Sequence, residues 1–386
     1  MVTSGPTSQG FQFEDCLLKH YVRTQGWLPL CRERKRKVIE GVPEKRRRRV
    51  RYFTFCAVGA IDVLMLDVAT VLRPSSEDKF DTVVFFDKDA DAVNETQKRI
   101  PGAIGFPGNF TEVVLTGDPN EDLYKDPDPL APPNDETDRY LTRKKQLILA
   151  QRRRFIKTFP FDVINLDLEE FIFKPNDPFP GKVVNALRKI FEWQRLPLFY
   201  LDKELPPLDG FTLMFTTQIG PPNISNEYVD MLRRYLVQNL DADPVLRDLL
   251  ETRTGLTEID ALRSDQFPIF FKLGVPKLLA GILLDEDWYV DPDTGIRTYE
   301  FVRQSSSGDY TMLHFVMDVV RQDPPREKRA PNTGLAPNIA TAYRDVSRGI
   351  FEIPETVVTE SIIDADNLKP TLQQIKARRK KYYPDE

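Results

Sequence analysis

The chain has 386 residues, of which 41% are hydrophobic and 29% charged, and its formal net charge is −5. These values are ordinary for a soluble globular protein, and the length suits one large domain with additions or two domains. No apolar run approaches the ~20 residues that span a bilayer, and the N-terminus lacks the basic and then apolar order of a signal peptide. We therefore expect a cytoplasmic protein that does not contact a membrane.

Cysteine and histidine are scarce, with three and two copies. Cys16, His20 and Cys31 are close in sequence, but a structural zinc ion needs four ligands. We therefore expect no metal site, and instead two half-buried thiols and a surface histidine. A hydrolase with a histidine base would depend on His20 or His314. His314 lies in a strand-like run, which favours a packed strand residue over a base.

The composition changes along the chain and predicts three regions. Residues 1–50 form a basic N-terminal extension, 51–321 a globular domain with an insertion and a basic helix at 116–160, and 322–386 a proline-rich linker and C-terminal tail. Basic clusters near both ends of an acidic chain indicate contact with nucleic acid or with a partner protein. A solvated charge run remains the alternative.

Strands and helices alternate after residue 50. The strands are expected at 51–58, 81–87 and 103–106, and the helices at 60–73 and 90–100. Continuous apolar strands in a βαβαβ order are typical of a parallel, doubly wound sheet that helices cover on both faces. Asp62 and Asp67, on the first helix, are expected at its surface or as caps.

The second half of the domain continues this pattern. A helix with a basic face is expected at 138–159, a strand at 161–167, a helix at 181–194, a strand at 209–220, helices within 226–285, a hairpin at 288–304 and a strand at 309–321.

The carboxyl ends of the predicted strands carry the candidate site, because ligands of open α/β sheets bind there, near the point where the strand order reverses. A glycine lets the backbone approach a ligand, and the next helix offers N–H groups to a carboxylate. An acid after the second strand can accept two hydrogen bonds from a ribose diol. The residues at these ends are Cys56 and Gly59, then Asp87, then Asn109, and finally Asn165 and Asp167.

This order of features resembles the class I S-adenosylmethionine (SAM)-dependent methyltransferases. The matching segments are 53–60 for motif I, VVFFDKD (83–89) for motif II, GNF (108–110) for the adenine contact, FDVINLD (161–167) for motif IV, and 299–321 for the antiparallel sixth and seventh strands. The spacing of FDVINLD from motif I is similar to that in RNA methyltransferases and three-Cys-motif partner proteins. The resemblance implies a Rossmann-like, seven-stranded, mostly parallel sheet with helices on both faces, antiparallel last strands, and N- and C-terminal extensions.

The resemblance also implies roles for the edge residues. Cys56, Gly59, Asp87 and Asn109 would hold SAM, and Asn165 and Asp167 would orient the acceptor. Two departures bear on activity. Of the usual acid-x-Gly-x-Gly of motif I only Gly59 remains, and motif IV has no proline.

Two functions follow from these features. The first is a SAM-dependent methyltransferase that acts on RNA or DNA. The alternative is a catalytically degenerate scaffold or binding subunit of a nucleic-acid-associated or defence complex. A cleft filled by Phe53, Phe86 or Phe106 would favour the scaffold. The phosphate contacts are expected from Arg34, Lys35, Arg46, Arg47, Arg48, Arg49, Arg152 and Arg153.

Overall fold

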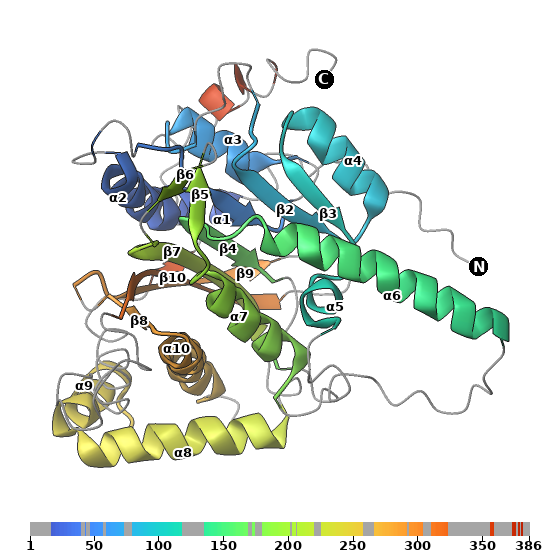
Figure 1. Ribbon diagram of the computed structural model, residues 1–386. Helices are drawn as coiled ribbons and strands as arrows, with labels where there is room; N and C mark the ends of the chain where they lie inside the picture. The colour runs from blue at the N-terminus through green and yellow to red at the C-terminus, as the bar shows by residue number, and fades with distance from the viewer. Residues whose placement is uncertain are drawn as a thin grey trace.

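The structure of the chain is a computed structural model in which a central sheet lies between two layers of helices (Figure 1). It describes residues 17–39, 43, 47–56, 59–72, 79–117, 135–168, 172–173, 180–200, 203–205, 207–219, 225–257, 266–291, 293–303, 310–322, 356–358, 373–375, 377–378 and 380.

Five parallel strands form one half of the main sheet, in the order β3-β2-β1-β4-β7. Their bounds are β1 Tyr52–Thr54, β2 Val83–Asp87, β3 Ile104–Pro107, β4 Val163–Asp167 and β7 Gly210–Ile219. Each strand is apolar along most of its length, so both of its faces can be buried beneath helices. The predicted mostly parallel sheet is confirmed.

The other half of the sheet is built around one long antiparallel strand. Strand β10 (Tyr310–Arg321) lies between β7 and β9 (Ile296–Arg303) and runs antiparallel to both, which confirms the antiparallel last strands. The predicted count of seven strands is wrong, because the sheet has nine. The additional strands are β8 (Trp288–Val290) and β11 (Thr356–Val358).

The two added strands explain the miscount. Strand β11 is a Thr-Val-Val run in the tail that pairs in parallel with β9, and three residues are too few to predict a strand. Strand β8 pairs with β10, whereas the predicted 288–304 hairpin would join it to β9. A separate two-stranded sheet joins β5 (Leu198–Tyr200) to β6 (Lys203–Leu205).

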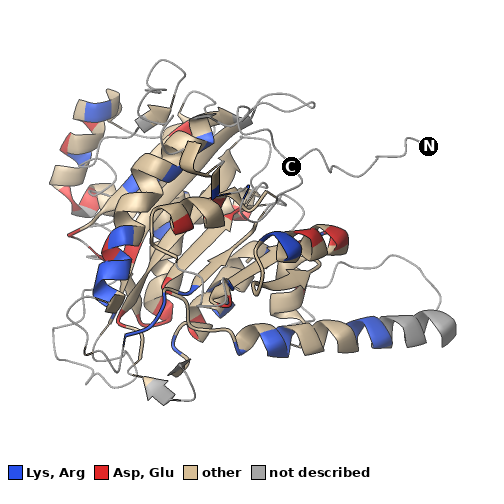
Figure 2. Cartoon of the chain, turned by 90° about the horizontal axis from the view of Figure 1, so that it is seen from above, with Lys and Arg blue, Asp and Glu red and all other residues tan. Residues whose placement is uncertain are grey.

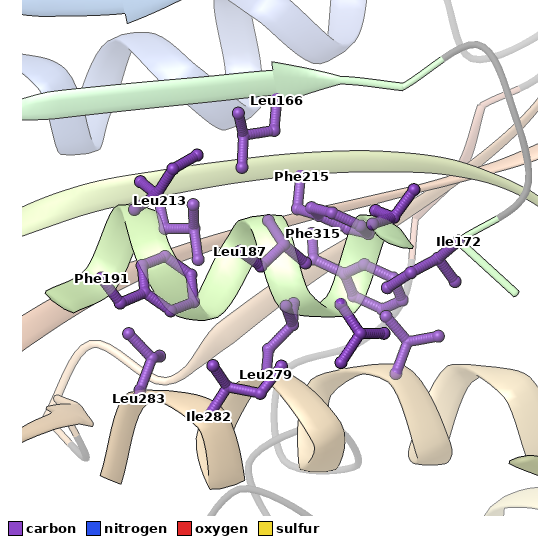
Figure 3. Packing of buried hydrophobic residues seen from close by; sticks show 14 of the residues in the cluster. Leu166, Ile172, Leu187, Phe191, Leu213, Phe215, Leu279, Ile282, Leu283 and Phe315 are labelled. Carbon is purple, nitrogen blue, oxygen red and sulfur yellow. The ribbon is translucent and has the colours of Figure 1, made fainter. Parts of the chain in front are cut away.

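Helices that follow β3 cover one face of the sheet. They are α5 (Phe110–Leu115), α6 (Asp135–Ile156), α7 (Lys182–Trp193), α8 (Asn226–Ala242), α9 (Pro244–Thr254) and α10 (Phe267–Asp285). Figure 3 shows α7 and α10 packing their apolar side chains against Leu166, Leu213 and Phe215 of the sheet. The helices predicted at 138–159, 181–194 and 226–285 are therefore present.

The N-terminal helices cover the opposite face together with α3 (Ile61–Val68) and α4 (Ala90–Arg99). The first three elements are α1 (Leu17–Tyr21), the π-helix η2 (Val22–Trp27) and α2 (Leu28–Ile39). Strand β1 divides its side chains between the two layers, since Tyr52 faces the N-terminal helices and Phe53 faces the other layer. This alternation is the period of a strand that is buried on both sides.

Helix α3 ends at Val68, before the predicted end at residue 73, and Thr70 just beyond it has a φ of 61°. Helix α10 is the one helix of the described residues that is long and apolar enough to cross a membrane by length and composition. Of its most apolar window, 72% is buried within the protein, which is also typical of a core helix.

Candidate functional site

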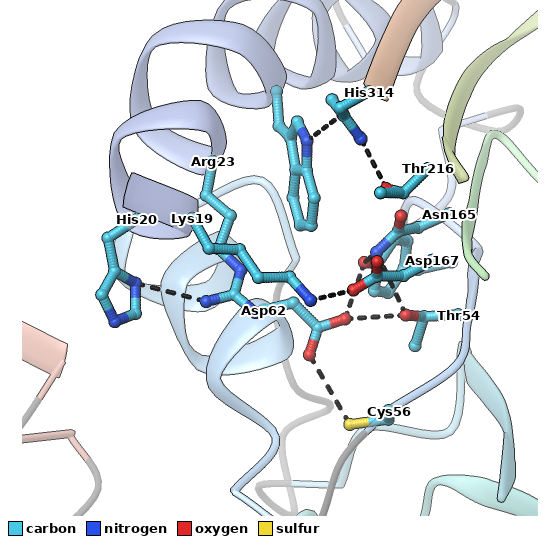
Figure 4. A network of polar contacts seen from close by, with 12 residues as sticks. Lys19, His20, Arg23, Thr54, Cys56, Asp62, Asn165, Asp167, Thr216 and His314 are labelled. Atoms are coloured by element: carbon cyan, nitrogen blue, oxygen red, sulfur yellow. Dashed lines mark hydrogen bonds and ion pairs between the residues drawn. The ribbon is translucent and has the colours of Figure 1, made fainter. Parts of the chain in front are cut away.

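The strand order places the candidate site at the carboxyl ends of β1 and β4. Strands β2 and β3 follow β1 on one side, and β4 and β7 lie on the other, so the order reverses between β1 and β4. A crevice at such a reversal is where α/β sheets bind ligands. The side chains at this edge form a connected polar network, and helix α1 and the π-helix η2 lie over it (Figure 4).

Asp62, on the first turn of α3, is the acceptor at the centre of this network. Its carboxylate accepts hydrogen bonds from the Tyr52 hydroxyl at 2.9 Å and the Thr54 hydroxyl at 2.7 Å, and its other oxygen lies 3.6 Å from the Cys56 sulfur. The expected surface position of Asp62 is wrong, since the residue is 6% exposed. Asp67 is also buried, and Arg378 of the C-terminal tail pairs with it.

A pattern in β1 could have revealed Asp62. Tyr52, Thr54 and Cys56 are spaced by two residues, so their polar atoms point to the same side of the strand. Three polar groups buried on one side need an acceptor. Burial, followed by the nearby Asp62 carboxylate, raises the pKa of the Cys56 thiol, and Asp87 contributes to the same shift. The thiol is therefore protonated at neutral pH and lies within the electrostatic reach of Asp87.

The turn between β1 and α3 contains the candidate motif I. Ala60 has a φ of 45°, in the left-handed region that disfavours residues with a Cβ. A Cβ added to Gly59 would meet only the Ile61 side chain, at 3.4 Å. Neighbouring atoms therefore do not require a glycine at position 59. Backbone strain at Ala60, where a relaxed turn would have glycine, is typical of functional loops.

Asn165 projects from β4 toward the same network. Its amide nitrogen donates to the Tyr52 hydroxyl at 3.1 Å and to the Thr54 hydroxyl at 3.3 Å. The residue is 2% exposed, and among the described residues its Oδ1 has no hydrogen-bond partner. A buried acceptor without a donor costs about 1–3 kcal/mol, so a ligand that donates an N–H or O–H there would be stabilised.

Asp167, at the end of β4, forms an ion pair with Lys19 of α1. Burial raises the pKa of the Asp167 carboxyl, but the charge and hydrogen bond of Lys19, together with the charge of Arg23, outweigh that effect, and the pKa falls to about 2. Asp167 is therefore a fixed anion at neutral pH. It can hold a cation or accept hydrogen bonds, but it is a poor general base.

His314 lies beside this pair and is buried, as predicted for a packed strand residue. The Trp27 indole N–H donates to its Nε2 at 2.5 Å, so its Nδ1 carries the proton and donates to the Thr216 hydroxyl at 2.6 Å. Burial lowers the pKa of His314 to about 3, which keeps the ring neutral. His314 thus fixes Trp27 and η2 against the sheet.

Asp87 and Asn109 lie at the ends of β2 and β3, on the other side of β1. Asp87 is partly buried, and one of its oxygens accepts the Asp89 backbone N–H at 2.9 Å. Asn109 is exposed and is the N-cap of α5, where its Oδ1 accepts the Thr111 backbone N–H at 2.9 Å. The capping bond occupies the Asn109 oxygen, so its amide N–H groups are what it can offer to an adenine edge.

Phe53, Phe86 and Phe106 are all buried. Phe86 stacks on Phe106 with ring centroids 5.1 Å apart, and Phe53 contacts Phe86 edge to face at 6.0 Å. These rings belong to the core between the sheet and α5–α7. Phe55, nearer the edge, packs on Phe110 at 4.9 Å.

The basic residues of the N-terminal region mostly contact acidic residues of this chain. Arg34 is 1% exposed and pairs with Asp209 and Asp318, contrary to the surface position that a phosphate contact requires. Arg48 pairs with the fully buried Asp162. The other predicted contacts are Arg49, which pairs with Asp81, Lys35, which bonds to Thr70 at 3.4 Å, Arg47, which is exposed, and Arg46, which lies outside the described residues.

Two predicted contacts lie on α6. Arg152 donates to the Val114 carbonyl at 3.0 Å and lies over the Trp193 ring, whereas Arg153 is exposed. Of the residues considered for zinc, Cys16 lies outside the described residues, and Cys31 and His20 are buried, so the expected surface position of His20 is wrong. The described part of the chain contains no cluster of three or more metal-ligating side chains.

Comparisons with known proteins give little further information. No protein-family model and no curated protein matches the chain. Among solved structures, a SAM-dependent methyltransferase from Methanosarcina mazei is similar, with 12% identity over 70% of this chain and 91% of that one, and a TM-score of 0.26. A likeness of this size does not assign the chain to a family.

Proposed function

We propose that the chain binds SAM at the carboxyl edge of β1, β2 and β3 and is a methyltransferase that acts on nucleic acid. The observation that carries this proposal is the buried, unpaired Asn165 Oδ1 at the reversal of strand order, with Asp87 on the other side of β1. The bound cofactor would supply an electrophilic methyl group.

The residues at the edge fit such a cofactor in three respects. The Asp87 carboxylate suits a ribose diol, the N-terminus of α3 offers backbone N–H groups to a carboxylate, and the Asn109 amide suits an adenine nitrogen. Asn165 and Asp167 would orient the acceptor, because both are acceptors on β4 and Asp167 stays ionised. Methyl transfer needs in-line positioning more than acid–base catalysis, so a low Asp167 pKa is compatible with it.

Titration calorimetry with SAM and with S-adenosylhomocysteine tests the cofactor site. We expect saturable micromolar binding, and a loss of at least about 100-fold in Asp87→Ala, because two hydrogen bonds to a charged group contribute about 1.5–3 kcal/mol each. Asp241→Asn, at an exposed position of α8, is the control and should bind as the wild type does. Unchanged affinity in Asp87→Ala would overturn the role of Asp87.

The nucleic-acid surface that we propose is the basic face of α6, which extends past the sheet and contains several Lys and Arg positions, coloured blue in Figure 2. At 100° per residue, Arg143, Arg153 and Arg154 fall within roughly 100° of one another, along about 16 Å of helix. Arg143 and Arg153 are exposed, and so is Lys157 just beyond the helix. Basic groups along this length of helix can contact several phosphates of a nucleic-acid backbone.

Salt-dependent binding tests this surface. Structured RNA is the first probe, because the spacing of FDVINLD is similar to that in RNA methyltransferases, and duplex DNA is the second. The triple variant Arg143→Gln, Arg153→Gln, Lys157→Gln should lower the slope of log K against log salt by about 2–3. A control with three exposed α8 and α9 arginines neutralised should keep the slope; these are Arg233, Arg234 and Arg253. Equal slopes in the two triples would overturn the proposal.

Three observations favour the degenerate scaffold as a second candidate. Lys19 already holds Asp167, and the N-terminal helices cover the edge where an acceptor would enter. The turn that has lost a motif I glycine also has backbone strain, at Ala60. A well-folded sample that binds neither SAM nor S-adenosylhomocysteine at millimolar concentration would favour this scaffold over the enzyme.

A further inference from the structure

We propose that Lys19 is a methyl acceptor of this chain, so that the protein modifies its own N-terminal helix. The inference rests on the proposed SAM site and adds a named acceptor atom to it, the Lys19 Nζ. It follows from the position of Lys19 in the network of Figure 4.

The Lys19 Nζ bonds to the Asp167 carboxylate, at the end of β4 where the resemblance places the acceptor. The Lys19 side chain is 22% exposed and that of Asp167 is 13% exposed, so the amine is largely enclosed but still reached by water. The ion pair joins residues 148 positions apart in sequence, and it therefore depends on the docking of α1 on the sheet.

Asn165 carries a second acceptor on the same strand as Asp167, its unpaired Oδ1. Asn165 and Asp167 are two residues apart on β4, so their side chains lie on the same face of the sheet. A neutral lysine amine has two N–H donors and one lone pair. If Asp167 accepts one N–H and the unpaired Asn165 Oδ1 accepts the other, the lone pair is left to face the methyl donor.

Hydrogen bonds link this acceptor pair to the proposed cofactor turn. The Asn165 amide nitrogen donates to Thr54, Thr54 donates to Asp62, and Asp62 lies against Cys56 just before that turn. The Lys19 amine and the turn thus lie on opposite sides of one polar network at the reversal of strand order. The inference requires that the methyl group of a donor bound at the turn reach the amine across this network.

The reaction balances with SAM as the co-reactant. The Lys19 ammonium, which solvent reaches, first loses a proton to hydroxide or to a buffer base, because Asp167, with a pKa of about 2, is too weak a base to take it. The Nζ lone pair then forms a bond to the methyl carbon, and the bond from that carbon to sulfur breaks with its electron pair moving to sulfur. The products are Nζ-methyl-lysine and S-adenosylhomocysteine.

Peptide mass mapping after incubation of the full-length protein with SAM tests the proposal. We expect Lys19 to gain the mass of a methyl group, and Lys98, which is 76% exposed on α4, to remain unmodified. In Asp167→Ala the modification should be roughly 100-fold slower, because a misplacement of about 1 Å has that effect on rate. Lys98→Arg is the matched control and should be modified at Lys19 as fast as the wild type.

A second readout does not depend on turnover. In the absence of SAM, acetic anhydride should label Lys19 more slowly than Lys98, and Asp167→Asn should remove much of that protection because the ion pair is lost. Equal labelling of both lysines in the wild type would contradict the enclosed position of Lys19.

The outcomes separate this inference from the proposed function. SAM binding by calorimetry with no methyl group on Lys19 would overturn the inference and leave the cofactor site intact. Equal methylation of Lys19 and Lys98 would also overturn it, because enclosed placement would then have no effect. Absence of SAM binding would overturn the proposed function first, and the inference with it.

Discussion

Asp62 shows how one side chain can organise a candidate site. Its carboxylate serves the hydroxyls of Tyr52 and Thr54, and these hydroxyls in turn accept from the Asn165 amide. The geometry of Asn165, and with it the direction of its unpaired Oδ1, therefore depends on Asp62. Removing one member of such a buried polar network leaves the others without a partner.

We predict that Asp62→Ala lowers the free energy of unfolding by about 3 kcal/mol, because two buried hydroxyls lose their acceptor. Asp62→Asn retains one oxygen acceptor and should lose about half as much. Urea unfolding followed by circular dichroism measures both values. A loss below about 1 kcal/mol in Asp62→Ala would mean that the hydroxyls find other acceptors.

Lys277 is a second informative residue, because it is fully buried in α10 and its Nζ lies 3.4 Å from the Tyr235 carbonyl. Burial lowers its pKa to about 7. The unfolded chain, with a lysine pKa of about 10.4, binds more protons than the folded protein between pH 7 and pH 10. This residue should therefore make the protein more stable as the pH rises through that window.

Lys277→Met should accordingly stabilise the protein by about 3 kcal/mol at pH 6 and by much less at pH 10, since the cost of burying the ammonium is then gone. Thermal unfolding at the two pH values measures the difference. Lys98→Met, at an exposed position, serves as the control and should change stability at neither pH. An equal gain at both pH values would show that burial does not lower the pKa of Lys277 relative to the unfolded chain.

At the scale of elements, the N-terminal basic region holds itself to the sheet by ion pairs. Arg34 reaches Asp318 on β10, and Arg48 reaches Asp162 beside the start of β4. Asp162 also accepts the Arg51 backbone N–H at 2.9 Å. Because of these ion pairs, few of the N-terminal residues predicted to bind phosphate are accessible. We therefore place the proposed nucleic-acid surface on α6.

Two neighbouring arginines test whether these ion pairs stabilise the fold. Arg48→Met should cost about 3–5 kcal/mol of stability, because it leaves the fully buried Asp162 without its partner. Arg49→Met should cost at most about 1 kcal/mol, since its pair with Asp81 is at the surface. Guanidinium unfolding measures both, and similar losses would refute the distinction.

At the scale of the whole molecule, one sheet joins two apolar layers. Trp27 belongs to the layer of the N-terminal helices, whereas Trp193 and Trp288 belong to the layer of α5–α10. Strand β1 contributes Tyr52 to the first layer and Phe53 to the second. Neither layer can lose its packing without exposing a face of the same strands.

We predict that the two layers unfold together. Fluorescence of Trp27→Phe reports the layer of Trp193 and Trp288, and fluorescence of the Trp193→Phe, Trp288→Phe double variant reports Trp27. For each variant, the midpoint of unfolding by fluorescence should coincide with the midpoint by circular dichroism, as two-state unfolding requires. An earlier transition of Trp27 would show that the N-terminal helices detach before the sheet melts.

The fold was largely predictable because its signals are local. Apolar strands such as VVFFD and VINLD, separated by amphipathic helices, are recognised within a few residues of sequence. The exceptions are short or depend on a distant partner. Strand β11 has three residues and forms by pairing with β9, and β8 pairs with β10 across an intervening strand in sequence.

The candidate site was predictable only in part. Asp87 and Asp167 lie at strand ends as predicted, because strand ends follow from local pattern, whereas Asn165 lies in the middle of β4. Lys19 and Asp62 were missed as site residues. A π-helix and a short helix over the sheet edge bring Lys19 into position, and no local pattern near residue 19 indicates that contact.

The sequence by itself determined the alternation of strands and helices, because the spacing of apolar residues within each segment is enough to tell a strand from a helix. Only the tertiary structure decided where the charges of the basic N-terminal region are neutralised and which amine meets Asp167. Those outcomes depend on partners more than a hundred residues away, such as Lys19 with Asp167 and Arg48 with Asp162. Such pairs become neighbours only when the sheet assembles in its non-sequential order, and a long-range order of this kind is not encoded in any single segment.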